Sequence, residues 1–156
     1  MKRLLIYVDA SVVGGCEDEE FASGSLALWR LFIEGRYVMA LSEHTLRELA
    51  GAPEPVRLRL SEIPEAHCMM VPDSQEAAAL ADAYLAHGVV GPGSHADALH
   101  VALATVSHAD VLVSWNFKHI VNLRRIRLFD AVNLESDYPG IEIRTPLEIL
   151  RDEEDL

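Results

Sequence analysis

Cysteine is scarce in this sequence: the 156 residues include only two, Cys16 and Cys68, which lie far apart. Their number and spacing do not suit a structural metal site, and so few cysteines fit a reducing compartment in which disulfides are rare. Long hydrophobic runs are also missing, since no stretch approaches the ~18 consecutive apolar residues of a membrane span. We therefore expect a cytoplasmic protein without a membrane partner.

Positive charge is scarce as well. The chain has 13 Lys and Arg against 25 Asp and Glu, which gives a formal net charge of −12. Such a balance argues against broad, sequence-independent binding to nucleic acid through phosphate neutralisation. It does not exclude a nuclease, because a metal ion and a local basic patch can offset the overall field.

Two further signatures are incomplete. The glycine-rich segment 88–93 is not followed by Gly-Lys-Ser/Thr, so a phosphate-binding loop for nucleoside triphosphates is disfavoured. Seven histidines suggest zinc, but neither the pair His44 and Glu48, four residues apart, nor the pair His95 and His100 completes a set such as His-Glu-x-x-His.

The hydrophobic pattern predicts alternating strands and helices. Short apolar runs at 4–8, 37–41, 68–71, 111–114 and 141–144 have the length of strands, and helical patterns separate them. This order predicts an α/β protein, a three-layer α/β/α sandwich with a parallel sheet of four to five strands. We expect one domain over 1–150 and an acidic, disordered tail over 151–156.

The first apolar run ends in a carboxylate, Asp9, which is followed at once by small residues. In an open α/β sheet the ligand crevice lies outside the carboxyl ends of the strands, so Asp9 stands where a functional site is expected. From these residues alone, a cap that only turns the chain is an equally good interpretation.

Three more polar residues occupy comparable positions. Glu48 lies in the helix after the second strand, Asp97 lies in the first turn of an apolar helix, and Asn116 follows the strand at 111–114. Carboxylate and amide oxygens without nitrogen or sulfur ligands suit Mg²⁺ or Mn²⁺. A bound cation would relieve the repulsion among clustered acids and activate water for attack on a phosphodiester.

The sequence around these residues resembles the PIN-domain ribonucleases, including the VapC-like toxins of toxin–antitoxin pairs. The resemblance runs from Leu4 to about Leu150, and four motifs carry it: VDASV at 8–12, TLREL at 45–49, ADALHVALA at 96–104 and DVLVSWNFKHI at 110–120.

The resemblance implies catalytic roles for Asp9, Glu48, Asp97 and Asn116, with the three acids as metal ligands and Ser11 supporting the first acid. It also implies a PIN-like parallel sheet, an Mg²⁺- or Mn²⁺-dependent ribonuclease with RNA as substrate, a small antitoxin protein as partner, and a homodimer. Many members carry Asp where this chain has Asn116, and the amide removes one negative charge from the site.

One dense basic patch begins within the last of these motifs and continues beyond it, and it consists of Lys118, Arg124, Arg125 and Arg127. Two interpretations are consistent with this basic patch. It is a surface that contacts RNA phosphates, or its side chains pair with acids elsewhere in the protein. For the two aromatic residues of the motif, Trp115 and Phe117, we favour core positions over stacking on bases.

Two alternatives to a ribonuclease stay open. The first is a PIN fold of weak or lost activity that only binds RNA or a partner protein. The amide of Asn116, in the place of an acid, is consistent with this alternative. The second is a receiver-like phosphoacceptor domain, which is disfavoured because the central acids lie on helices and no lysine follows a late strand in the required setting.

Overall fold

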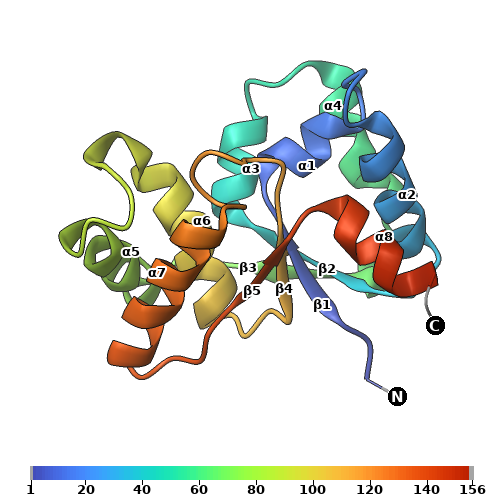
Figure 1. Ribbon diagram of the computed structural model, residues 1–156. Coiled ribbons are helices and arrows are strands. Elements are labelled where there is room, and N and C mark those ends of the chain that lie inside the picture. Colours follow the sequence, from blue (N-terminus) through green and yellow to red (C-terminus); the bar gives the residue numbers. More distant parts are fainter. Residues whose placement is uncertain (1, 155–156) are drawn as a thin grey trace.

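The computed structural model describes residues 2–154 and contains one five-stranded parallel sheet (Figure 1). The strands follow the order β3-β2-β1-β4-β5 across the sheet. Their bounds are Leu5–Val8 for β1, Val38–Ser42 for β2, Cys68–Val71 for β3, Val111–Val113 for β4 and Glu142–Arg144 for β5. All five coincide with the predicted runs, and the expected three-layer α/β fold is confirmed.

Helices cover both faces of this sheet. Their bounds are Ala10–Gly15 (α1), Ala22–Ile33 (α2), Glu43–Leu49 (α3), Glu54–Leu58 (α4), Gln75–Ala86 (α5), His95–Val106 (α6), Leu123–Glu135 (α7) and Pro146–Glu154 (α8), with 3₁₀ turns at Arg59–Glu62, Glu65–His67 and Pro92–Ser94. Figure 1 shows α5, α6 and α7 on one side and α1, α2, α4 and α8 on the other. Within residues 2–154 no helix is long and apolar enough to cross a membrane.

Alternation along the strands divides the core into two layers. Tyr7 of β1 points into the layer beneath α5, α6 and α7, whereas its neighbours Ile6 and Val8 point into the layer beneath α2. All three side chains are fully buried. Because both faces are covered, the central strands β1, β2 and β4 are apolar on both sides, as buried parallel strands require.

The strand order creates a switch point between β1 and β4. The chain moves outward from β1 to β2 to β3 and then crosses back to the other side of β1 to form β4 and β5. At such a point successive connections diverge and leave a crevice outside the carboxyl ends of the two central strands. Asp9 follows β1 and Ser114 follows β4, so both residues border this crevice.

The same strand order bears on the receiver-like alternative. Flavodoxin-like proteins of the receiver type have the order 2-1-3-4-5, in which the third strand lies beside the first. Here β3 lies at the outer edge beside β2. The topology therefore disfavours the receiver interpretation.

Two helix starts differ from what the sequence predicts. The sequence predicts a flexible turn over residues 12–15, but these residues form most of the short helix α1, because the Asp9 carboxylate accepts the Val12 N–H and caps that helix. Asp73, with Glu76 three residues on, predicts a capping box for the next long helix, but Ser74 caps helix α5. The Asp73 carboxylate instead accepts a hydrogen bond from Arg47 at 2.7 Å.

The expected disordered tail over 151–156 is wrong for residues 151–154, which belong to α8. Ile149 anchors this helix in the core, and the Tyr37 hydroxyl donates a hydrogen bond to the Glu153 carboxylate. These contacts hold the acidic end against the sheet layer. Residues 155 and 156 of the expected tail lie outside the described residues.

Candidate functional site

The Asp9 carboxylate lies at the carboxyl end of β1 and is 4% exposed. Its Oδ1 accepts hydrogen bonds from the Ser11 hydroxyl at 2.6 Å and from the Val12 N–H at 3.2 Å, and its Oδ2 accepts one from Ser114 at 2.6 Å. The role of Asp9 as a helix cap is confirmed, and Asp9 also stands where the crevice of an open α/β sheet is expected, so its role in a functional site stays a prediction. Oδ2 retains a lone pair for a ligand.

The same two serines tie the end of β4 to the end of β1. Ser11 Oγ accepts the Trp115 N–H at 2.9 Å, and Ser114 Oγ accepts the Asn116 N–H at 2.9 Å. Ser114 therefore supports Asp9 from the opposite strand, a role that no sequence motif assigned to it.

Asp97 and Asn116 come together from α6 and the loop after β4. The Asn116 amide donates a hydrogen bond to Asp97 Oδ1 at 3.1 Å, and its own oxygen accepts the His119 N–H at 3.0 Å. Burial raises the pKa of the half-buried Asp97 carboxyl, and the negative charges of Asp9 and Glu48 raise it further. The nearby imidazoles of His119 and His100 oppose this rise. Asp9 and Glu48 therefore both lie within electrostatic reach of Asp97.

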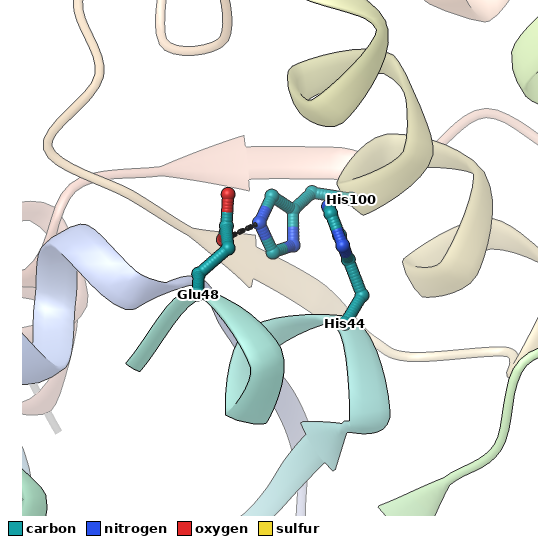
Figure 2. A group of neighbouring side chains, drawn as sticks. All are labelled: His44, Glu48 and His100. Atoms are coloured by element: carbon teal, nitrogen blue, oxygen red, sulfur yellow. Dashed lines mark hydrogen bonds and ion pairs between the residues drawn. The ribbon is translucent and has the colours of Figure 1, made fainter. Parts of the chain in front are cut away.

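Glu48 makes its direct contact with a histidine and not with the other two acids. Its Oε1 lies 2.5 Å from His100 Nε2 (Figure 2). Within residues 2–154 no hydrogen bond joins Glu48 to Asp9 or Asp97. Burial raises the pKa of Glu48, but the hydrogen bond to His100 and the charges of His100 and His44 outweigh it, so the net pKa lies below its ordinary value. Glu48 therefore stands ionised at the edge of the crevice.

His44 joins Glu48 and His100 to make a group whose ligand atoms all lie within 4.8 Å of one another, the one such group of three His, Cys, Asp or Glu side chains in residues 2–154. The sequence showed His44 and Glu48 one helical turn apart, but it could not show that the third member comes from α6. Burial lowers the pKa of His44, and the charge of His100 lowers it further.

The basic patch of Lys118, Arg124, Arg125 and Arg127 lies in the loop after β4 and in the first turns of α7. Within the described part of the chain none of the four forms an ion pair with an acid. Arg125 donates to the Val89 carbonyl, while the other three side chains are exposed. The interpretation of these residues as partners of distant acids is therefore disfavoured.

The two aromatic residues beside the site differ in position. Trp115 is buried, stacks on Phe21 with ring centroids 4.5 Å apart, and donates its indole N–H to Ser25 Oγ at 2.9 Å. Gly15 permits this approach, because a Cβ there would collide with Ser25 and the indole. Phe117, which we also expected in the core, is 51% exposed. It is free to stack on an unpaired base.

Known proteins resemble this chain in fold, at low sequence identity. No protein-family model and no curated protein matches the chain. The protein is similar to a chain in the crystal structure of VapBC2 from Rickettsia felis bound to a promoter DNA fragment. The two share a TM-score of 0.56 and 13% sequence identity over 91% of this chain and 98% of that one. A chain of the structure of FitAB bound to an IR36 DNA fragment gives a TM-score of 0.55 and 16% identity over 90% and 94%.

These likenesses define the class of fold. They span nearly the whole of both chains, and they confirm the PIN-like α/β/α architecture. The first neighbour carries the VapBC name, in agreement with the VapC-like resemblance carried by the sequence motifs. At these identities the likeness concerns the fold.

The raised pKa of Asp97 predicts a stability change for Asp97→Asn. A carboxyl whose pKa is raised by folding favours the folded state only when protonated, so its ionisation lowers stability as pH rises through the folded pKa. In buffer with a chelator, we expect Asp97→Asn to be more stable than the parent at neutral pH and to lose this advantage on acidification. Urea unfolding between pH 4 and 8 measures the difference.

The matched control is Asp82→Asn on α5, since the Asp82 side chain is 74% exposed and its contact with His95, at 3.7 Å, is a solvated surface pair that contributes little to stability. Its stability should stay close to that of the parent across this pH range. An Asp97→Asn variant that is less stable than the parent at neutral pH would show that the carboxylate is not penalised in the cation-free fold.

Proposed function

We propose that the protein is a divalent-cation-dependent endoribonuclease and the toxin of a toxin–antitoxin pair. The observation that carries the first part is the position of Asp97: a half-buried carboxylate at the switch-point crevice whose pKa is raised by burial and by the charges of Asp9 and Glu48. A bound cation would offset the cost of ionising Asp97 beside two other acids. The resemblance of the four motifs to PIN-domain ribonucleases supplies the reaction class.

The donor set fits a hard cation. Asp9 presents carboxylate oxygens at the carboxyl end of β1, and Asp97 presents them in the first turn of α6. Glu48 adds a third carboxylate from α3. Oxygen donors of this kind suit Mg²⁺ or Mn²⁺. When bound, such an ion supplies a Lewis acid for the phosphodiester and an activated water.

The chain's own residues would orient this site. Three hydrogen bonds fix the Asp9 carboxylate, and the Asn116 amide fixes Asp97 at 3.1 Å. Asn116 would therefore act by positioning Asp97, while it lowers the negative charge of the site by one relative to an acid. This arrangement favours one tightly held cation over two.

The proposed RNA surface extends from the crevice along the start of α7. Exposed Phe117 offers a stacking platform, and the basic patch offers cations for phosphates within an otherwise acidic protein. Phe117 and Lys118 directly follow Asn116, and the three arginines follow in the first turns of α7, so an RNA strand lying on these residues would lead toward Asp97.

The proposed antitoxin partner and homodimer rest on the resemblance to VapC-like toxins. The VapBC2 and FitAB structures, both bound to DNA fragments, support the same class by fold. A reading frame for a small DNA-binding protein beside the gene would support the toxin role, and a gene that stands alone would count against it.

The nuclease proposal predicts loss of activity in Asp9→Asn and Asp97→Asn. With Mn²⁺ or Mg²⁺ the parent should cleave single-stranded RNA, and each variant should fall by about a thousandfold or more, because a missing ligand forfeits several kcal/mol of charge stabilisation. Cleavage of a fluorescent RNA panel, with circular dichroism to verify folding, measures this effect.

Asp82→Asn serves again as the control and should retain the parent's rate. Variants that cleave as well as the parent would show that the site lies elsewhere. A folded parent that cleaves no RNA and binds no Mn²⁺ by calorimetry would establish instead the alternative of a PIN fold that only binds a partner.

The basic patch predicts a salt-dependent contribution to RNA affinity. The double substitution Arg124→Ala with Arg127→Ala should weaken binding of single-stranded RNA and lower the slope of log affinity against log salt by roughly 0.7 for each phosphate that is no longer neutralised. Fluorescence anisotropy at several salt concentrations measures the slope, with Asp97→Asn as background to prevent cleavage.

Arg30→Ala is the control for this experiment, because Arg30 is exposed on α2 over the opposite face of the sheet. It should leave the slope unchanged. Equal slopes for the double variant and the parent would remove the basic patch from the RNA surface.

A further inference from the structure

The cluster of His44, Glu48 and His100 differs in chemistry from the oxygen site beside it. His44 and Glu48 share one face of α3, and His100 reaches them from α6, so that its ring lies between the other two side chains (Figure 2). The ligand atoms of the three lie within 4.8 Å of one another. Two imidazoles and a carboxylate thus converge from two helices.

Each imidazole has one ring nitrogen held by a hydrogen bond from outside the cluster. His44 Nε2 donates to the Ala96 carbonyl at 3.0 Å, which places the proton there and leaves the Nδ1 lone pair free. In residues 2–154 no hydrogen bond occupies that Nδ1. Such a bond from the second ring nitrogen to a carbonyl is the usual support of a histidine that binds a metal.

His100 has the corresponding support from Tyr7. Its Nδ1 lies 2.7 Å from the Tyr7 hydroxyl, which in turn lies 2.8 Å from Ser42 Oγ. In the absence of an ion the His100 Nε2–H donates to the ionised Glu48 carboxylate. Because the Tyr7 hydroxyl can accept as well as donate, a cation that displaces the Nε2 proton leaves Nδ1–H bonded to Tyr7 and the Nε2 lone pair available to the ion.

The burial of the cluster suits a ligand site that opens on one side. His100 is 2% exposed and His44 is 8% exposed, whereas the Glu48 side chain is 33% exposed and forms the entrance. The buried imidazoles are already fixed in orientation, so they lose little side-chain conformational entropy when an ion binds.

We propose that His44, Glu48 and His100 form a second cation site, selective for Zn²⁺, that shares Glu48 with the oxygen site. Two histidines and a glutamate are a ligand set used for zinc, at about 2.0–2.1 Å from nitrogen. Imidazole ligands favour Zn²⁺ over Mn²⁺ and Mg²⁺, which prefer oxygen. Because one carboxylate serves both sites, Zn²⁺ withdraws Glu48 from the oxygen site and inhibits cleavage.

Zinc binding by the full-length protein tests the site without reference to activity. In competition with a chromophoric chelator, the parent should bind Zn²⁺, and His44→Ala and His100→Ala should each weaken binding by roughly a hundredfold or more, since removing a ligand exceeds the about 10–100-fold effect of its supporting bonds. His95→Ala, at the exposed start of α6, is the matched control and should bind as the parent does. X-ray absorption of the zinc complex should show two imidazole ligands.

A parent that fails to bind Zn²⁺, or a folded His44→Ala variant that binds it as the parent does, would overturn the proposal. His44→Ala decides the question if His100→Ala does not fold, because His44 makes no hydrogen bond to Tyr7 comparable to that of His100 within the described residues.

The regulatory part rests on the proposed nuclease function. At fixed Mg²⁺, Zn²⁺ should inhibit the parent at lower concentration than it inhibits His44→Ala, with each protein referred to its own zinc-free rate. Equal inhibition of the two would overturn the shared-ligand mechanism. A parent that binds Zn²⁺ through these residues but never cleaves RNA would support the zinc site and count against the nuclease proposal alone.

Discussion

Two serine hydroxyls hold the Asp9 carboxylate between the carboxyl ends of β1 and β4, and the geometry of the crevice depends on them. Ser11 donates from the first turn after β1, and Ser114 donates from the end of β4, each at 2.6 Å. The same oxygens accept the backbone N–H groups of Trp115 and Asn116. The loop that carries Asn116 toward Asp97 is therefore set by the atoms that orient Asp9, and a change at either serine would disturb both halves of the site.

Much of this arrangement could be predicted because it follows local rules. Short apolar runs indicated the five strands, and their alternation with helices required parallel pairing. Parallel strands bring their carboxyl ends to one edge, so residues such as Asp9 and Asn116 had to lie near each other once the strand order placed β1 beside β4. The fold was therefore within reach of the sequence, and so was the position of the crevice.

What could not be predicted depends on contacts between distant segments. Nothing local to Glu48 shows that its carboxylate lies against His100, or that Tyr7 and Ser42 support that histidine from the sheet. Competition between similar residues was equally hidden, since Asp73 and Ser74 both suit a helix cap and only the pairing of Asp73 with Arg47 decides between them.

The central claim is that the crevice acids hold a hard divalent cation. A crystal structure of the protein soaked in Mn²⁺, with anomalous scattering to locate the ion, tests it most directly. We expect a manganese peak bonded to carboxylate oxygens of Asp9 and Asp97, at the distances of roughly 2.0–2.6 Å that oxygen ligands keep from such cations. Manganese bound only at other places, or no manganese at an intact and accessible crevice, would contradict the claim.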